Sequence, residues 1–104
     1  MTPEQQRIAI AEACVWTVHP KNKWVVIPPN SPHSVQPLYT LPDYLNDLNA
    51  MHEAEKVLKG GMRSKYDAEL TLICSRDYNF IWESTASQRA EAFLRTIGKW
   101  EVSQ

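Results

Sequence analysis

Prolines are concentrated in residues 28–42, and this is the strongest local constraint on how the chain folds. A proline has no backbone N–H to donate and restricts the residue before it, so neither a helix nor a central strand runs through such a stretch. We therefore expect a long loop, with room for one short edge strand at residues 35–40. A loop of this length inside a compact domain is uncommon and often functional. The prolines are Pro28, Pro29, Pro32, Pro37 and Pro42.

Before the proline stretch, the sequence predicts a helix followed by a β-hairpin. Residues 2–5 (TPEQ) form a capping box, with a threonine cap, a proline at the first helical position and a closing glutamine. Apolar residues at helical spacing follow, so we expect a helix over residues 3–14. Residues 15–18 and 24–27 are rich in β-branched and aromatic side chains and flank a polar turn. This pattern is typical of two short strands joined as a hairpin.

After the proline stretch, a stripe of apolar residues with helical spacing predicts a second helix. Two residues compete for its start, because both Thr40 and Asp47 can cap a first helical turn. We expect the helix to end at Lys59, because a pair of glycines follows at residues 60–61. The stripe consists of Leu48, Met51, Ala54, Val57 and Leu58.

The next two segments are harder to assign. Apolar positions over residues 62–74 favour a helix, although residues 70–74 (LTLIC) on their own also fit a buried strand. Residues 78–83 (YNFIWE) carry aromatic side chains at alternate positions. Alternation of this kind is typical of a strand with one aromatic face, so we predict a strand there.

The last helix is the most clearly delimited element. A second capping box occupies residues 85–88 (TASQ), and Gly98 ends the helix. We expect Trp100, in the short tail, to fold back onto the domain. The order of elements favours a single domain over residues 1–104 of the α+β class, in which helices pack on a small sheet as an α-β-α sandwich.

Composition excludes several classes of protein. The chain has 11 Lys plus Arg against 12 Asp plus Glu and is 43% hydrophobic, which argues against disorder and against generic nucleic-acid binding. No apolar run approaches the roughly 18 residues of a membrane span, and the N-terminus lacks the apolar centre of a signal peptide. We therefore expect a cytoplasmic protein that does not bind membranes. Cys14 and Cys74 are isolated, and we expect both to be buried small hydrophobic residues.

Three stretches resemble a known family. They are MTPEQQRIAIAEAC (residues 1–14) with Trp16, LPDYLNDLNAMHEAEKVL (residues 41–58) and SQRAEAFLRTIGKW (residues 87–100). Together they cover a little under half of the chain and are similar to small bacteriophage proteins of the phage ABA (α-β-α) sandwich domain family. The resemblance implies helices on both faces of a sheet and a location in the cytoplasm of a bacterial host. Because that family is largely uncharacterised, it implies no catalytic residues.

The sequence contains no recognisable catalytic pattern. His52 and Glu55 lie one turn apart and have the spacing to share a metal, but the neighbouring Asn49, Glu53 and Lys56 indicate a solvated helix face. The chain has no HExxH motif, no serine in a G-x-S-x-G context and no glycine-rich phosphate loop. We therefore predict no catalytic residue, no bound metal and no cofactor.

Aromatic residues on both sides of the proline stretch are the strongest indication of function. Large aromatic side chains form the core of many small domains, but they are also enriched at binding hot spots. Two tryptophans lie in the predicted hairpin and two tyrosines flank the turn after the loop, with a histidine and a lysine to add polar contacts. The candidate binding surface consists of Trp16, His19, Lys23, Trp24, Tyr39 and Tyr44.

These observations predict a small, non-enzymatic accessory domain, and the resemblance implies that it is derived from a phage. It would act by binding a protein partner from the host or the phage, and by self-association. The alternative is a protein that binds or sequesters a small, nucleotide-like ligand. In that case Trp16, Trp24 or Tyr44 would stack on a base near Lys23 or Arg63.

Overall fold

The structure is a computed structural model that describes residues 1–19, 21–22, 24–29 and 34–102. Its four helices and its small sheet establish the α+β class. The helices are α1 (Pro3–Ala13), α2 (Leu48–Glu55), α3 (Gly61–Arg76) and α4 (Ala86–Thr96). The strands are β1 (Thr17–Val18), β2 (Val25–Ile27) and β3 (Gln36–Pro37), and two short 3-10 helices are η1 (Leu38–Thr40) and η2 (Ile81–Glu83).

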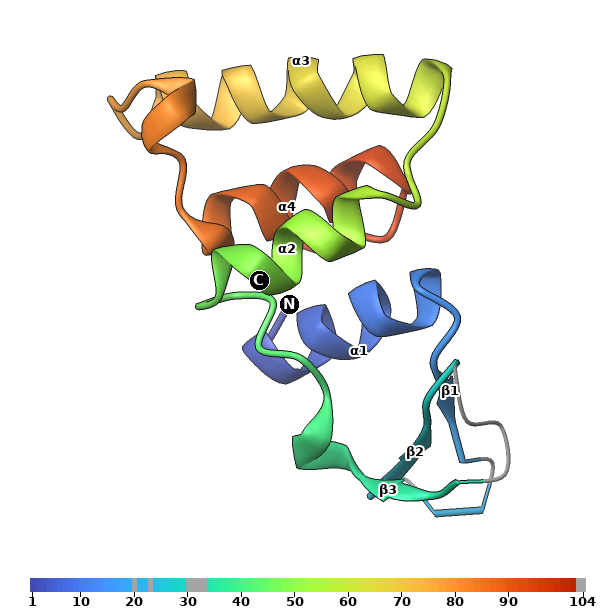
Figure 1. Ribbon diagram of the computed structural model, residues 1–104. Helices are drawn as coiled ribbons and strands as arrows, with labels where there is room; N and C mark the ends of the chain where they lie inside the picture. The colour runs from blue at the N-terminus through green and yellow to red at the C-terminus, as the bar shows by residue number, and fades with distance from the viewer. Residues whose placement is uncertain (20, 23, 30–33, 103–104) are drawn as a thin grey trace.

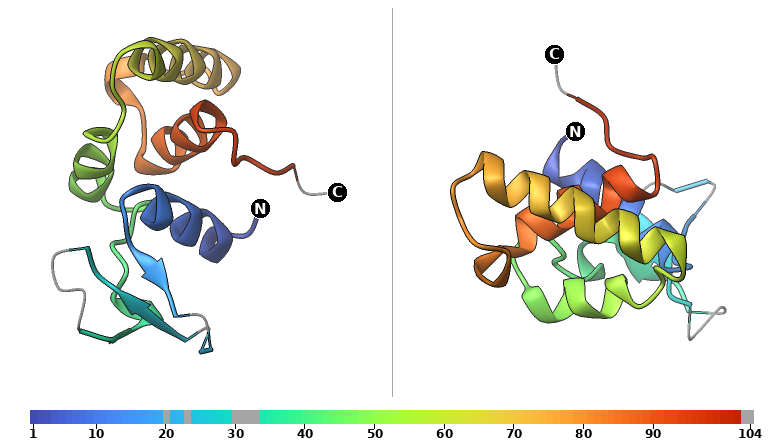
Figure 2. Two further views of the ribbon diagram at one scale, coloured as in Figure 1. Left: turned by 90° about the vertical axis from the view of Figure 1, so that its right-hand side faces the viewer. Right: turned by 90° about the horizontal axis from the view of Figure 1, so that it is seen from above.

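The prediction of helices packed on a small sheet is confirmed, and the helices are distributed unevenly around that sheet. The three strands lie at one end of the molecule, next to α1 (Figure 1). α1 contacts β1 and also packs against α4, so it connects the sheet to the other helices. α2 and α4 lie between α1 and α3 (Figures 1 and 2). The end of the molecule that carries the sheet is therefore attached to the rest mainly through one helix.

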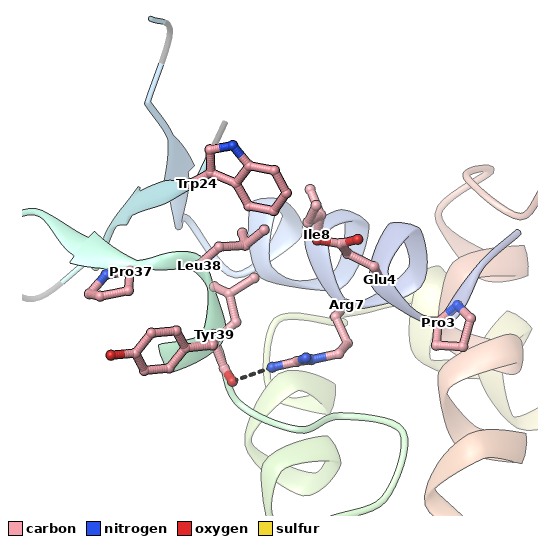
Figure 3. Close-up of a pocket in the computed structure, with 9 residues that line it drawn as sticks. Pro3, Glu4, Arg7, Ile8, Trp24, Pro37, Leu38 and Tyr39 are labelled. Atoms are coloured by element: carbon pink, nitrogen blue, oxygen red, sulfur yellow. Dashed lines mark hydrogen bonds between the residues drawn. The ribbon is translucent and has the colours of Figure 1, made fainter. Parts of the chain in front are cut away.

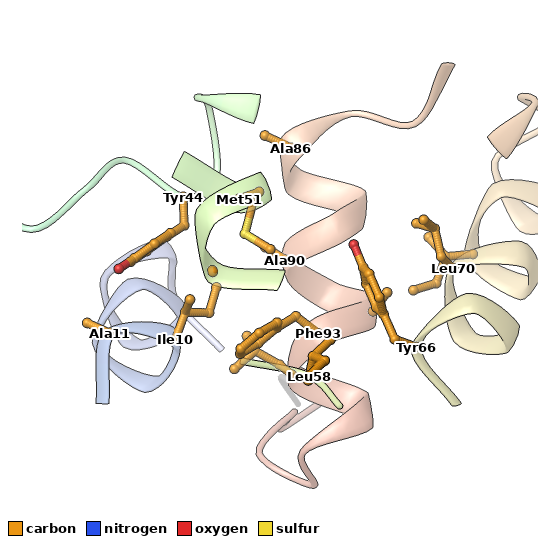
Figure 4. Packing of buried hydrophobic residues seen from close by; sticks show 14 of the residues in the cluster. Ile10, Ala11, Tyr44, Met51, Leu58, Tyr66, Leu70, Ala86, Ala90 and Phe93 are labelled. Carbon is orange, nitrogen blue, oxygen red and sulfur yellow. The ribbon is translucent and has the colours of Figure 1, made fainter. Parts of the chain in front are cut away.

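The hydrophobic core is centred on α4. Ala90 and Phe93 are fully buried in this helix, and Figure 4 shows them between α1 on one side and α3 on the other. The small alanines let neighbouring helices approach closely, while burial of a side chain as large as Phe93 contributes roughly 1.5–3 kcal/mol. Tyr66 of α3 and Met51 of α2 complete the centre of the core, and both are fully buried.

The predicted hairpin and edge strand are both present and short, but residues 38–40 of the predicted edge strand form the 3-10 helix η1 instead. β1 and β2 pair antiparallel, with Val18 opposite the buried Val26. β3 pairs with the other side of β2, which places Pro37 on an edge strand. An edge position tolerates proline because the outward N–H of an edge strand has no partner strand.

β1 begins later than residue 15 because α1 ends in a tight reversal. Val15 has a φ of 70°, and the Trp16 N–H donates a hydrogen bond to the Ala11 carbonyl at 2.9 Å. This is the Schellman ending of a helix, in which glycine usually occupies the left-handed position. The backbone of Val15 and Trp16 therefore belongs to the end of the helix, and the strand starts at Thr17.

α2 begins at the second of the two candidate caps. The Asp47 carboxylate accepts a hydrogen bond from the Asn49 N–H at 2.9 Å. The prediction that the helix reaches Lys59 is wrong by about one turn, because after Glu55 the backbone N–H groups bond to carbonyls three residues back instead of four. The glycine pair does mark a break, since Gly60 has a φ of 59° and α3 follows it.

α3 confirms the helical interpretation of residues 62–74, but the strand predicted at residues 78–83 is wrong. The chain leaves α3 through Tyr78, which has a φ of 60°, and continues into the short helix η2. All three strands of the described residues lie at the opposite end of the molecule, so the segment has no strand beside it with which to pair (Figure 1).

The C-terminal predictions are confirmed. Thr85 and Gln88 form the capping box of α4, and Gly98 follows the helix with a φ of 75°. Trp100 packs against the hydrophobic core, and the Arg95 guanidinium lies over its ring at 5.3 Å from the ring centre. The tail therefore contributes to the fold.

Both cysteines are free thiols. Cys74 is buried as predicted, whereas Cys14 is only half-buried, so the prediction is wrong in part for Cys14. Burial raises the pKa of each thiol, and a raised pKa lowers the fraction of reactive thiolate.

A buried carboxylate connects α2, α3 and α4. The side chain of Glu55 is 8% exposed, and it accepts hydrogen bonds from the Tyr66 hydroxyl at 2.6 Å and from Arg89 Nη1 at 2.9 Å. Arg89 also donates from Nε to the Ser84 hydroxyl at 2.9 Å. Burial and the bond to Glu55 both raise the pKa of Tyr66, which therefore remains a donor. These contacts satisfy a charge that would otherwise be costly to bury.

We expect the substitution Glu55→Gln to destabilise the fold by about 3 kcal/mol, because it leaves the Arg89 cation without its charged partner. The matched control is Glu53→Gln, the same change on the same helix. Glu53 pairs with Lys56 at 2.9 Å in the open, with side chains 73% and 70% exposed, so its loss should change stability by no more than about 0.5 kcal/mol. Urea unfolding followed by circular dichroism measures both, and equal losses would contradict this role for Glu55.

Candidate functional site

A hollow of about 580 Å³ lies between α1 and the segment formed by β2, β3 and η1 (Figure 3). We call it the groove. Its size falls within the range of about 300–1,000 Å³ that is typical of ligand sites. The residues that line it are Pro3, Glu4, Arg7, Ile8, Trp24, Pro37, Leu38, Tyr39 and Leu41.

One wall of the groove is a face of α1. Glu4 and Ile8 lie four residues apart, as do Pro3 and Arg7, so the four side chains share one side of the helix. The capping box at Thr2 fixes the beginning of this helix and therefore the position of the wall.

The opposite wall is built around Trp24, whose backbone is held on both sides. The Trp24 N–H donates to Asn22 Oδ1 at 3.0 Å, and its carbonyl accepts from the Leu38 N–H at 2.7 Å. Its indole ring lies over Leu38 and points toward Ile8 of α1 (Figure 3). The side chain is nevertheless 73% exposed. A large aromatic group is thus held at the mouth of an apolar hollow.

Arg7 connects the two walls. Its Nη2 donates to the Leu41 carbonyl at 2.8 Å and its Nε to the Pro42 carbonyl at 3.4 Å, and Figure 3 shows one such bond as a dashed line. The guanidinium thereby holds the chain that follows η1 against α1. With Glu4, it is one of the two charged side chains of a lining that is otherwise mostly apolar.

The structure divides the predicted binding surface between separate places. Trp24 and Tyr39 line the groove, although the ring of Tyr39 points away from α1 and is 81% exposed (Figure 3). Trp16 and Tyr44 line another hollow of about 350 Å³, together with Cys14.

The remaining predicted residues lie outside both hollows or outside the described part of the chain. His19 Nδ1 accepts a hydrogen bond from the Lys21 backbone N–H at 3.2 Å, so His19 shapes its own turn. Lys23 lies outside the described residues.

Tyr44 is buried, and this burial, followed by the contact with the Cys14 thiol, raises the pKa of its hydroxyl. Tyr44 therefore belongs to the core more than to a binding surface.

A second apolar feature lies at the turn between α3 and α4. The rings of Phe80 and Trp82 stack with centres 4.6 Å apart and an angle of 4° between their planes. They are 60% and 75% exposed. We call this pair the aromatic knob. The alternating aromatics of residues 78–83 were its signal in the sequence, and the strand prediction obscured it.

Sequence reasoning also missed the α1 wall of the groove. The apolar stripe of this helix indicates its buried side, on which Ile10 and Ala11 lie. The wall residues carry no comparable signal, because a proline, a carboxylate and an arginine are ordinary residues of an exposed helix face, and Ile8 looks like a member of the apolar stripe.

The residues that the sequence suggests for a metal site or a nucleotide site do not lie together in the structure. His52 is exposed on α2, and Arg63 lies on α3 over the Tyr66 ring, where it also approaches Glu55. In the part of the chain that the structure describes, no three His, Cys, Asp or Glu side chains are placed to hold a metal ion. None of the helices there has the length and apolar character needed to cross a membrane.

Comparisons with known proteins identify no relative. The chain matches no protein-family model, no curated protein and no solved structure. Arguments about function therefore rest on the groove and the knob.

We expect Arg7→Met to make the chain after η1 more mobile, because the carbonyls of Leu41 and Pro42 lose the side chain that donates hydrogen bonds to them. The loss in stability should be about 1–2 kcal/mol. Amide hydrogen exchange over residues 38–47 should become faster while exchange in α3 is unchanged. The control is Lys65→Met, an equally drastic change at an exposed position of α3. Equal exchange over residues 38–47 in the two variants would show that Arg7 does not hold this wall.

Proposed function

We propose that this chain is a small binding domain that takes an apolar segment of a protein partner into the groove. The single observation that supports this function is the exposed Trp24 at the mouth of a preformed apolar hollow. Tryptophan is enriched at binding hot spots because it buries a large area with little loss of conformational freedom. In keeping with the resemblance described above, we further propose that it is a phage accessory protein that acts in the cytoplasm of the bacterial host.

The groove also indicates the chemistry of the segment that it would bind. Ile8 and Leu38 offer apolar contacts on the two walls, and Trp24 offers a ring face. Glu4 and Arg7 give the rim one charge of each sign, which would orient a segment with polar groups beside its apolar anchor. The expected ligand is therefore a short stretch of chain with one or two aromatic or aliphatic anchors.

Peptide display against the wild-type protein tests this function. Selected peptides should carry aromatic or aliphatic anchors, and Trp24→Ala should weaken their binding by about 30-fold, which corresponds to a hot-spot loss of about 2 kcal/mol. The control is Leu72→Ala, a truncation at an apolar residue that is 66% exposed on α3 and does not line the groove. If peptides bind Trp24→Ala as well as the wild type, the groove is not the binding site.

The groove has the volume for a small molecule, so a nucleotide-like ligand is the second candidate. Trp24 offers a surface on which a base can stack. The charges favour this ligand less, because Arg7 already donates to two carbonyls and Glu4 would repel a phosphate. A thermal-shift screen with nucleosides and nucleotides separates the candidates, since a ligand that binds the folded state raises the melting temperature. No shift across the panel would exclude this candidate.

A further inference from the structure

We propose that the groove binds the aromatic knob, Phe80 and Trp82, of a second copy of this chain. The inference rests on the proposed function, because it names the occupant of the same groove. It is carried by two features that one molecule presents together: an apolar hollow with an exposed tryptophan, and a projecting apolar pair of matching chemistry.

The turn that leads into the knob contains a backbone outlier. Tyr78, next to the knob in the chain, is 97% exposed and has a φ of 60°. Tyr78 follows α3 in the same position in which Gly98 follows α4. Gly98 has no side chain, so the left-handed conformation causes no strain there. A bulky aromatic residue in the left-handed region is a backbone outlier, and such outliers are common at functional sites.

A network of side chains holds the turn that carries the knob. Asn79 Nδ2 donates to Gln88 Oε1 at 2.9 Å, and Gln88 Nε2 donates to Asp77 Oδ2 at 2.9 Å. Arg76 donates to both oxygens of Asp77, at 2.9 and 3.1 Å, and these bonds with that from Gln88 lower the pKa of Asp77 to about 2. The turn is therefore ordered before it binds, which reduces the entropy lost on association.

The knob and the groove are complementary in character. The groove offers about 580 Å³ of mostly apolar space, which is the environment that two stacked rings need to leave water. Glu83 follows Trp82 directly and is exposed, and its carboxylate would be attracted to Arg7 and repelled by Glu4, the two charged residues that line the groove. Opposite charges beside an apolar contact favour one orientation of the partner.

The positions of the two features require a second molecule. η2, which contains Trp82, lies beside the end of α3, while η1, whose residues line the groove, lies beyond α1 at the other end (Figures 1 and 2). A knob that contacts a groove on another copy uses different surfaces on the two partners. Such heterologous contacts form rings or open chains and do not end at a symmetric dimer.

The contact area predicts weak association. Two aromatic side chains bury about 300–500 Å². With a similar area from the groove, the total is about 600–1,000 Å², which lies below the usual range of stable interfaces. Self-association should therefore appear only at high protein concentration, and a protein partner with a better-fitting segment would displace the knob.

Sedimentation velocity with two complementary variants tests the inference. Trp24→Glu places a charge in the groove but keeps the knob, and Trp82→Glu removes the knob but keeps the groove. Both residues are more than 70% exposed, so both variants should fold, which circular dichroism verifies. The control is Leu72→Glu on α3, the same kind of change at a residue that is 66% exposed and lines neither feature.

The wild type and Leu72→Glu should form species larger than a dimer as the concentration approaches about 1 mM, the range of a weak interface. Each of the other two variants alone should stay monomeric, and their equimolar mixture should form a dimer and nothing larger. A monomeric wild type, or self-association of Trp82→Glu alone, would overturn the inference. If peptides still bind through Trp24 in that case, the proposed function stands, and only the knob is wrong as the occupant of the groove.

Discussion

The arrangement of the helices depends on one buried carboxylate. Glu55 lies on a short helix, and its bonds to Tyr66 and Arg89 join α2, α3 and α4 at a point from which water is largely excluded. A lone carboxylate there would be strongly unfavourable, so these bonds favour the arrangement in which the three helices meet at this point. The apolar residues of α4 then pack between α1 and α3 (Figure 4), and Val26 of β2 joins the same hydrophobic core from the sheet.

The groove follows from this arrangement. The sheet has three short strands, too few to cover α1, and it is attached to the helices mainly through that helix. One face of the first two turns of α1 is therefore left beside β2 and η1 without a layer to cover it. Arg7 fixes the distance across the gap by bonding to the chain beyond η1. The hollow is thus a consequence of a small sheet beside a long helix face, and Trp24 stands at its mouth.

The sequence predicts best those parts of the fold whose signals come from a few neighbouring residues. The capping boxes at Thr2 and Thr85 predicted the starts of α1 and α4, because a cap is made by residues within one turn. Glycine was an uneven guide to helix ends, because Gly98 marked the end of α4 correctly whereas the glycine pair at residues 60–61 placed the end of α2 about one turn too late. α1 and α3 end in the same motif as α4, but with Val15 and Tyr78 in place of a glycine, and a strand was predicted to begin at each of these residues. The groove escaped prediction because its two walls meet only through tertiary packing.

The four tryptophans provide the most direct measurement of the central claim, that the groove of one copy binds the knob of another. Each indole N–H gives its own signal in a nitrogen–proton NMR spectrum. On dilution from about 1 mM, the range of weak interfaces, the signals of Trp24 and Trp82 should shift together. Trp16 and Trp100 pack against the core and should not move. Four signals that are all independent of concentration, or that all shift equally, would contradict the account.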